Sequence, residues 1–247
     1  MVVPVRNEEQ LLDSALAHIC AAMDRVAARG RLRARLVVVL DDCTDGSNNI
    51  AAAATAADGR ISTISTGARC VGAARALGVS KALADVAPPS LHRWWIANTD
   101  ADTRVPPDWL DLFAEAADDG ADALAGTVEP DSAELGPARF AAWRAAHSST
   151  EGHPHIHGAN LGVRASAYLQ AGGFAPVSCD EDVRLVAALR AHGARVRSSS
   201  SPTVITSARL RGRLDHGFAD YLAGLPDAGE DTRRWATQCV DSAGRQP

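Results

Sequence analysis

Two aspartates spaced one residue apart could hold a divalent cation or a ligand hydroxyl group. Asp100 and Asp102 follow the apolar run 94–97, and Pro106 and Pro107 prevent that run from continuing as a strand. In extended backbone, residues i and i+2 project to the same side, so both carboxylates would lie together where the strand ends. Ligands bind at that edge of open α/β sheets, and Mg²⁺ or Mn²⁺ prefers oxygen ligands. The alternative interpretation is a solvated turn that caps the next helix.

An alternation of apolar runs and helical periods positions this acid pair along the chain. The segments 2–5 and 36–40 are predicted strands, and each precedes a segment with helical periodicity. A weaker strand over 61–64, a helix over 72–84 and the run 94–97 continue the alternation. The order β-α-β-α-β-α-β is typical of an α/β sheet of parallel strands joined by right-handed crossovers.

Polar residues follow several of these strands and would gather along one rim of the sheet. The segment 6–9 follows the first strand and is expected to open a helix, and the polar segment 41–47 follows the second strand. Unpaired carboxylates gain nothing from packing at a buried strand end, so this convergence indicates ligand binding. Later in the chain, we expect helices over 137–147 and from Asp180 onward, and a short strand at 204–205.

The bulk properties favour a soluble α/β protein. The 247 residues fit one large domain or two small ones, and 46% hydrophobic with 22% charged residues argues against disorder. The net charge of −5 disfavours a nucleic-acid partner. No apolar run is long enough to span a bilayer and no secretory signal precedes the first strand, so we expect a cytoplasmic protein, with peripheral membrane contact left open. Five cysteines without paired spacing indicate reduced thiols rather than a disulfide or zinc framework.

Seven short motifs follow one another from residue 2 to about residue 222. They are Val3–Glu9, Asp41–Gly46, Gly72–Gly78, the DXD motif Asp100–Asp102, His157–Asn160, Gly172–Phe174 and Glu181–Leu185. In order and spacing, they resemble the family 2 glycosyltransferases of GT-A-type fold. The resemblance implies one α/β domain over 1–224, with a mostly parallel central sheet flanked by helices. Residues 1–103 would form its nucleotide-binding half and 104–224 its acceptor and catalytic half, followed by a polar, loosely packed tail over 225–247.

The resemblance further implies a site for a nucleotide-diphosphate sugar donor and for Mn²⁺ or Mg²⁺. Asp102 would bind the metal directly, and Asp100 would share the metal or contact the ribose. A divalent ion would stabilise the charge that grows on the leaving diphosphate. UDP is the favoured nucleotide, and GDP remains open. Further donor contacts are implied for Pro4, Val5, Asn7, Glu8, Asp42, Arg75 and Ala101.

Basic residues near this site leave alternatives open. Arg209 and Arg213 are suited to clamp a diphosphate, because guanidinium groups bind phosphate in a bidentate manner, but both also fit a solvated basic turn. Arg75 fits a donor contact or a solvated charge on a helix. His216 could complete the metal shell, as histidines do in some related transferases.

On the acceptor side, the resemblance implies that a carboxylate takes the proton of the attacking hydroxyl as general base. We expect Asp182 to be this base and Glu181 to be the second choice, since adjacent helical residues point about 100° apart. A plain acidic helix start is the alternative. Transfer would invert the anomeric centre. His157 and Asn160 are implied sugar contacts, and the acceptor is expected to be a small or lipid-linked hydroxyl compound because little chain follows the base.

Other classes of protein fit the sequence less well. A sugar-phosphate nucleotidyltransferase would carry a glycine-rich basic loop after the first strand, and a dinucleotide oxidoreductase would carry G-x-G-x-x-G there, but the segment 6–9 has no glycine. His153, His155 and His157 could suggest zinc, although alternating histidines more often line a polar loop. A nucleotide-sugar-binding module without turnover is the non-enzyme alternative, which an assay of donor hydrolysis or transfer would distinguish.

Overall fold

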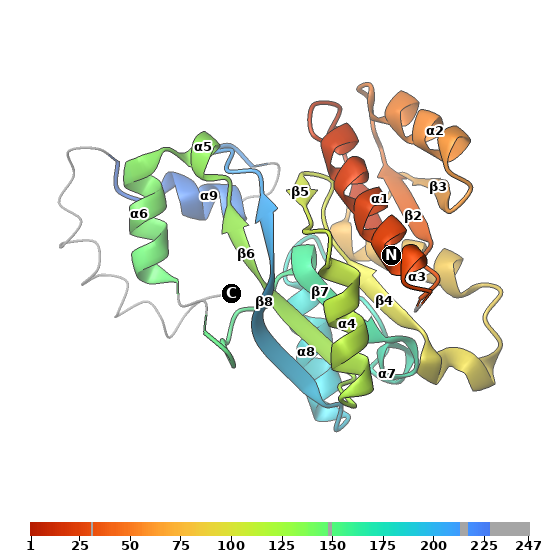
Figure 1. Cartoon of the computed structure of the whole chain (residues 1–247). Helices are drawn as coiled ribbons and strands as arrows, with labels where there is room; N and C mark the ends of the chain where they lie inside the picture. Colours follow the sequence, from red (N-terminus) through yellow and green to blue (C-terminus); the bar gives the residue numbers. More distant parts are fainter. Residues whose placement is uncertain (31, 148–149, 213–216, 228–247) are drawn as a thin grey trace.

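A mixed central sheet organises the part of the chain that this computed structural model describes, namely residues 1–30, 32–147, 150–212 and 217–227 (Figure 1). Within those residues the sheet has eight strands in the order β3-β2-β1-β4-β7-β6-β8-β5. The strands are β1 (Val2–Val5), β2 (Leu36–Asp41), β3 (Ile61–Thr66), β4 (Trp95–Asn98), β5 (Thr103–Arg104), β6 (Ala123–Pro130), β7 (Leu161–Arg164) and β8 (Val196–Thr206).

Most neighbouring strands of this sheet run parallel. β1 pairs in parallel with β2 and β4, β2 with β3, and β6 with β8. β7 is antiparallel to both β4 and β6, and β5 is antiparallel to β8. The predicted α/β fold with a mostly parallel central sheet is therefore confirmed, with β7 inserted in the opposite direction.

Helices pack on both faces of the sheet, because successive residues of a strand point to opposite sides. In β2, Leu36 and Val38 belong to one buried apolar cluster, whereas Val37 and Val39 belong to another. The first cluster lies under α1 (Leu12–Ala28), α2 (Ser47–Ala57) and α4 (Trp109–Asp118). The second lies under α3 (Val71–Leu83), α7 (Ala165–Gln170) and α8 (Glu181–Ala191). These two layers hold the strand ends in fixed positions.

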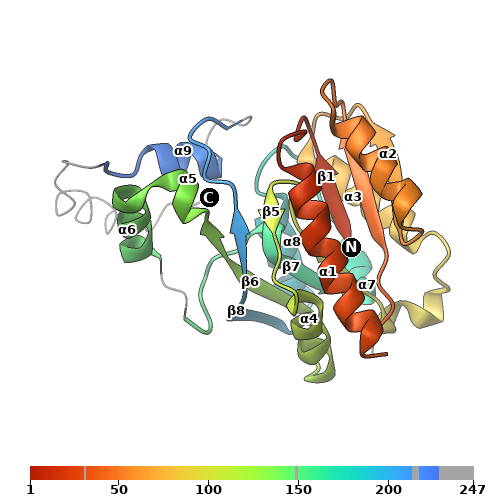
Figure 2. The same ribbon diagram turned by 45° about the horizontal axis from the view of Figure 1, so that its top comes forward.

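A small helical lobe lies at the far ends of β6 and β8, apart from the helices that cover the sheet (Figures 1 and 2). It contains α5 (Ser132–Leu135), α6 (Pro137–Ala146) and α9 (Phe218–Ala223). The lobe has an apolar cluster of its own, made of Leu135, Trp143, Ala208, Leu222 and Leu225. The 3₁₀ helices η1 (Pro88–Arg93) and η2 (Gly158–Asn160) precede β4 and β7.

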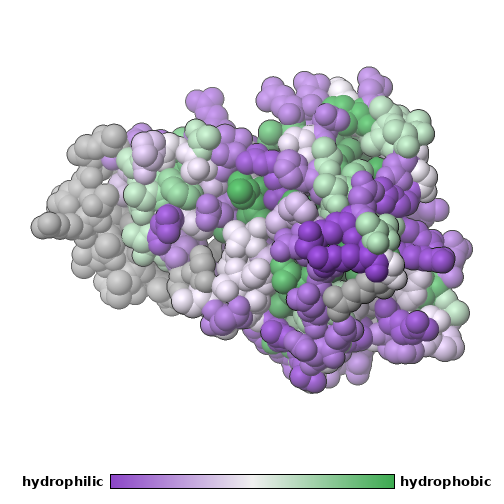
Figure 3. Space-filling model, in the orientation of Figure 1, coloured by the Kyte–Doolittle hydropathy of each residue, from purple (hydrophilic) through white to green (hydrophobic). Residues whose placement is uncertain are grey.

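Hydrophilic residues predominate on the face of the molecule shown in Figure 3, where hydrophobic residues form separate patches. Within the described ranges, no helix combines the length and the apolar character needed to cross a bilayer.

Two predicted elements begin at other residues in the structure. The first helix begins at Leu12 rather than within the segment 6–9, because the residues before it form turns in which the N–H of Leu11 bonds to the carbonyl of Glu8. β8 begins at Val196 rather than near residue 204, since its serine-rich first half is held by pairing with β6 and carries no apolar signal. The expected loose tail falls largely on 228–247, outside the described residues.

Candidate active site

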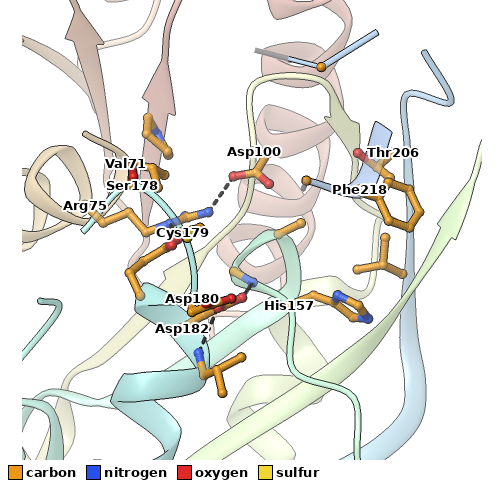
Figure 4. A pocket seen from close by; sticks show the side chains of 18 of the residues that line it. Val71, Arg75, Asp100, His157, Ser178, Cys179, Asp180, Asp182, Thr206 and Phe218 are labelled. Carbon is orange, nitrogen blue, oxygen red and sulfur yellow. Dashed lines mark hydrogen bonds and ion pairs between the residues drawn. The ribbon is translucent and has the colours of Figure 1, made fainter. Parts of the chain in front are cut away.

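The carboxyl ends of β1, β2 and β4 meet the start of α8 at one pocket of about 1440 Å³ (Figure 4). Both acidic pairs that the sequence singled out line this pocket, although they lie in different halves of the chain. The pocket wall near these strand ends includes Pro4, Val5, Glu8, Asp41, Arg75, Asp100, Ala101, Asp102, Glu181, Asp182 and Arg209. The fold therefore brings the two sets of acids to a common space.

Arg75, in α3, is buried between the two acidic pairs. It is 1% exposed and donates from Nη2 to Asp100 Oδ1 at 2.5 Å and from Nε to Glu181 Oε1 at 3.0 Å. Gly158 lies against the guanidinium group, and a Cβ at that position would come within 2.7 Å of Arg75 Nη2. The interpretation of Arg75 as a solvated helix charge is therefore wrong. This arginine joins the acid pair after β4 to the acid pair at the start of α8 (Figure 4).

Replacing Arg75 with methionine is expected to destabilise the fold by about 3–5 kcal/mol, because the buried Glu181 loses its cation. Urea unfolding followed by circular dichroism would measure the change. Arg184→Met, at an exposed position of α8, is the matched control. The double variant Arg75→Met/Glu181→Gln should recover part of the loss, since it also removes the unpaired charge. An unchanged free energy of unfolding for Arg75→Met would contradict this structural role.

A second arginine joins the acid pair to the loop after β1. Arg209 donates to both carboxylate oxygens of Glu8, at 2.9 and 3.0 Å, and from Nη2 to Asp102 Oδ2 at 2.5 Å. Thr206 Oγ1 donates to the other oxygen of Asp102 at 3.3 Å. Asp100 and Asp102 therefore have different arginine partners.

Asp102 combines burial with strong negative surroundings. Burial and the nearby Asp100 raise its pKa to about 6, although Arg209 opposes this rise. Such a carboxylate suits a divalent cation, because Mn²⁺ and Mg²⁺ take oxygen ligands and favour the ionised form. Within the described ranges, however, no three His, Cys, Asp or Glu side chains are grouped so that they could hold a metal. The residues fit a metal ion that takes its remaining ligands from a bound phosphate or water.

The two carboxylates at the start of α8 have different partners. Glu181 is buried against Arg75, and burial raises its pKa in spite of that arginine. Asp182 accepts the backbone N–H of Gly158 and, at 2.7 Å, that of Val183, and its side chain lines the pocket (Figure 4). Burial also raises the pKa of Asp182, and the hydrogen bond from Val183 limits the rise. Glu181 is thus committed to an ion pair with Arg75, whereas Asp182 faces the pocket and is held by backbone N–H groups.

A family model decides where this chain belongs. The model described as "Glycosyl transferase family 2" matches residues 1–168, which is more than half of the chain. The chain belongs to glycosyl transferase family 2. The matched part of this family 2 chain contains Asp100 and Asp102 after β4, and it ends within α7, before the second acidic pair. A sequence search of curated proteins found no match.

Solved structures share the fold of this family 2 chain at low sequence identity. A mannosyltransferase from Pyrobaculum calidifontis in complex with GDP-Man and Mn²⁺ is 21% identical, with a TM-score of 0.59 over 85% of this chain and 57% of that chain. GalNAc-T7 with UDP, GalNAc and Mn²⁺ is 13% identical, with a TM-score of 0.61 over 83% of this chain and 43% of that chain. Glucosyl-3-phosphoglycerate synthase from Mycobacterium tuberculosis with Mn²⁺, UDP and glucosyl-3-phosphoglycerate is 18% identical, with a TM-score of 0.52 over 92% and 80%. The chain spans about half the length of the first two proteins, and the likeness shows the GT-A fold alone.

Two of the residues expected to contact the donor hold turns beside the pocket instead of lining it. Asn7 and Asp42 adopt φ of 54° and 53°, a left-handed region that asparagine and aspartate tolerate better than most residues. Asn7 Oδ1 accepts the backbone N–H of Thr44 at 2.7 Å, and Asp42 accepts from Arg69 Nε at 2.6 Å. The other expected donor contacts, which do line the pocket, are Pro4, Val5, Glu8, Arg75, Asp100 and Ala101.

Asn160 was expected to contact a sugar, but its amide group is used inside the protein. The side chain is fully buried, its oxygen accepts from Trp109 Nε1 at 3.0 Å, and its Nδ2 donates to backbone carbonyls of β6 and β8 at 2.8 and 2.7 Å. It therefore fastens η2 to the sheet. His157, which directly precedes η2, does line the pocket. Arg213 and His216 lie outside the described residues.

Asp41 is a pocket residue that the sequence did not single out. It is 4% exposed, and its two carboxylate oxygens accept the backbone N–H groups of Arg69 and Cys70 at 2.8 and 2.9 Å. Asp41 thereby fixes the loop that leads into α3. The only sequence signal was the pair Asp41–Asp42, and the strand register decides that the first of the two faces the pocket.

One wall of the pocket is made of aromatic rings from the helical lobe and from the loop before η2. Among the described residues, the rings on the pocket surface are those of His147, His155, His157, Phe218 and Tyr221, here called the ring wall. His155 lies 5.4 Å from His147 and 6.2 Å from His157 between ring centroids, and Tyr221 lies 5.4 Å from His147 and 6.5 Å from Phe218. His153 lies 5.9 Å from His155 between ring centroids and extends this stack, but it does not line the pocket.

Lowering the pH is expected to destabilise the protein through this stack. Burial, followed by the neighbouring histidines, lowers the pKa of His157 to about 4, against about 6.5 in an unfolded chain. The unfolded state therefore binds more protons below about pH 6.5, so this contribution to stability is full above that pH and is lost as the pH falls towards 4. His157→Asn should remove on the order of 1–2 kcal/mol of this pH dependence, measured as the difference between urea unfolding at pH 7 and at pH 5. Parallel pH profiles for the two proteins would contradict the expectation.

Proposed function

We propose that this chain transfers a hexosyl group from a nucleotide-diphosphate sugar to a hydroxyl group of an acceptor, with Mn²⁺ or Mg²⁺ as cofactor and with inversion at the anomeric carbon. The observation that carries the proposal is the common pocket of Asp100, Asp102 and Asp182. The carboxylates that bind the donor and the carboxylate that activates the acceptor must face one space, because the two substrates react with each other there. A protein with these carboxylates on opposite sides could not perform the transfer. The family membership and the solved complexes with nucleotides and Mn²⁺ support the same reaction class.

At the donor end, Asp102 would hold the divalent ion together with phosphate oxygens of the donor. When bound, that ion supplies a Lewis acid beside the diphosphate leaving group. Arg209 would turn from Asp102 towards the phosphates, because guanidinium binds phosphate in a bidentate manner. Asp100, held by Arg75, would contact the ribose or share the metal, and the β1 and β2 ends would surround the nucleotide. UDP is favoured, and GDP is an alternative to be tested.

At the acceptor end, Asp182 would take the proton from the attacking hydroxyl group. The hydroxyl oxygen forms a bond to the anomeric carbon while the bond from that carbon to the diphosphate oxygen breaks, and the diphosphate leaves with the electron pair. Asp182 suits this role because its raised pKa makes it a stronger base than an ordinary aspartate. Glu181 acts as a positioning residue, since its ion pair with Arg75 links α8 to α3.

A screen of nucleotides by thermal shift tests the proposal. UDP, GDP and their glucose and mannose conjugates are compared with and without Mn²⁺, because a ligand of the native state raises the unfolding temperature, and the stabilisation grows with the logarithm of the ligand excess over Kd. We expect one nucleotide to raise the unfolding temperature only with the metal, followed by formation of a glycosylated product or slow donor hydrolysis. A shift without any turnover of the donor would favour a binding module instead, and the absence of any shift would contradict the proposal.

A further inference from the structure

The ring wall extends the pocket from the acid at the start of α8 to the helical lobe. His157 directly precedes Gly158, whose backbone N–H bonds to Asp182, so the first ring of the wall is next to the base. The stack of histidines then leads to Phe218 and Tyr221 of α9. In Figure 4, His157 and Phe218 lie on the side of the pocket next to β6 and β8, opposite Arg75 and Cys179. An acceptor at Asp182 therefore has a wall of rings beside it.

The rings are electrically neutral at physiological pH. Burial lowers the pKa of His147, and burial together with the neighbouring histidines lowers the pKa of His155 and of His157. A neutral imidazole offers a flat, polarisable face and no full charge to pair with an anion. The ring wall is thus a surface for stacking rather than for ion pairing.

The charged residues around this end of the pocket are mainly acidic. On α8, on α9 and in the loop before α8, the described lining residues with a charge are four carboxylates and one guanidinium group, namely Asp180, Glu181, Asp182, Asp220 and Arg190. Arg75, which lies between Asp100 and the start of α8, already bonds to two carboxylates. An acceptor with its own phosphate or carboxylate group would therefore meet more repulsion than attraction here.

We infer that the acceptor is a neutral alcohol that carries a ring close to the reacting hydroxyl group and stacks this ring against the ring wall. This inference rests on the proposed transfer reaction and names its acceptor class. Two kinds of compound share the required chemistry, a neutral sugar and an aromatic alcohol, since both present a flat face next to a hydroxyl group. Stacking on the wall holds the ring while Asp182 reaches the hydroxyl proton.

Direct binding of acceptor probes tests the inference independently of turnover. Saturation-transfer NMR in the presence of UDP and Mn²⁺ measures Kd for methyl β-glucoside, 4-hydroxybenzyl alcohol, glycerol and 3-phosphoglycerate. The first two represent the two ring-bearing kinds, glycerol is a neutral alcohol without a ring, and 3-phosphoglycerate is an anion. We expect at least one ring-bearing probe to bind tighter than both glycerol and 3-phosphoglycerate, by about three- to tenfold. Tighter binding of 3-phosphoglycerate, or equal binding of all four probes, would overturn the inference.

Variants of the central ring separate stacking from other effects. His155→Ala should weaken binding of the ring-bearing probe by about three- to tenfold, whereas His155→Phe, which retains a ring, should keep the Kd near that of the parent. His192→Ala, at an exposed histidine after α8, is the matched control. Equal binding by His155→Ala and the parent would overturn the inference. The Kd of UDP, measured on the same samples, reports on the proposed donor site separately, so that a failure there is distinguishable from a failure of the ring wall.

Discussion

Asp182→Asn is expected to lower kcat by about 10²–10⁴-fold while leaving the Kd of the donor close to that of the parent protein. The amide keeps the shape of the side chain, and its one carbonyl oxygen can still accept one of the two backbone N–H groups that Asp182 binds, that of Gly158 or that of Val183. It cannot take a proton from the acceptor. Because Asp182 contacts neither arginine of the donor end, its loss should not disturb the acids after β4.

Single-turnover kinetics and calorimetry on the same preparation measure the two halves of this prediction. Asp85→Asn, at an exposed site after α3, controls for the loss of one negative charge. A variant that retains the kcat of the parent would show that Asp182 is not the base. Glu181→Gln should behave differently from Asp182→Asn, with a loss of stability that accompanies any loss of activity, because it breaks the ion pair with Arg75.

The pH dependence of the activity tests the role of the Asp182 carboxylate independently. Burial raises the pKa of Asp182, and a general base works only when ionised. The activity of the parent should therefore fall as the pH is lowered through a value higher than the usual pKa of an aspartate, which is about 3.9. Asp182→Asn should lack this step in whatever activity remains. A parent profile that stays flat down to the usual aspartate range would contradict the burial argument.

The order of the elements and the place of the first acid pair could be predicted from the sequence, because both depend on local patterns. Apolar runs such as 36–40 become strands buried on both faces, and their polar ends meet at one rim as parallel pairing requires. The start of a helix at Glu181 could be predicted in the same way. Helix geometry also predicts that the carboxylates of Glu181 and Asp182 point in different directions.

The partners of these acids could not be predicted, because they come from distant parts of the chain. Arg75 and Glu181 are separated by 106 positions, and Arg209 and Glu8 by 201. No periodicity reports such a pairing, and a lone arginine on a helix looks the same in sequence whether it is buried or solvated. Burial decides between the two only after α3, β4 and α8 have packed together. The interior role of Asn160 was hidden for the same reason, since its partners belong to α4, β6 and β8.

The paired arginines also explain how the site tolerates its acids. The carboxylates of Glu8, Asp100, Asp102, Glu181 and Asp182 are among those that line this pocket, and like charges brought close together raise each other's free energy. Arg75 neutralises Asp100 and Glu181. Its guanidinium group is a permanent part of the packing, because Gly158 and the two carboxylates enclose it. Arg209 is more exposed, with 34% of its side chain accessible, so it can leave Asp102 at lower cost. The two arginines therefore differ: Arg75 fixes the packing of the site, whereas Arg209 is the more easily displaced partner of Asp102.

Asp102→Ala is accordingly expected to abolish the metal dependence of donor binding, while the fold is retained. Arg209 keeps its two hydrogen bonds to Glu8 in this variant, so no buried cation is left unpaired. The divalent ion loses the carboxylate that the proposed function assigns to it. The affinity for the ion should fall by about 10–100-fold or more, since even changes to groups that hydrogen-bond to a metal ligand have effects of that size.

Calorimetric titration of UDP with and without Mn²⁺ measures the difference between the two conditions in each protein. The parent should bind UDP more tightly with the metal, Asp85→Ala should behave as the parent does, and Asp102→Ala should give one Kd in both conditions. If the parent itself bound UDP equally well without Mn²⁺, the buried carboxylate after β4 would have Arg209 as its physiological partner, and the metal would have no place in the reaction.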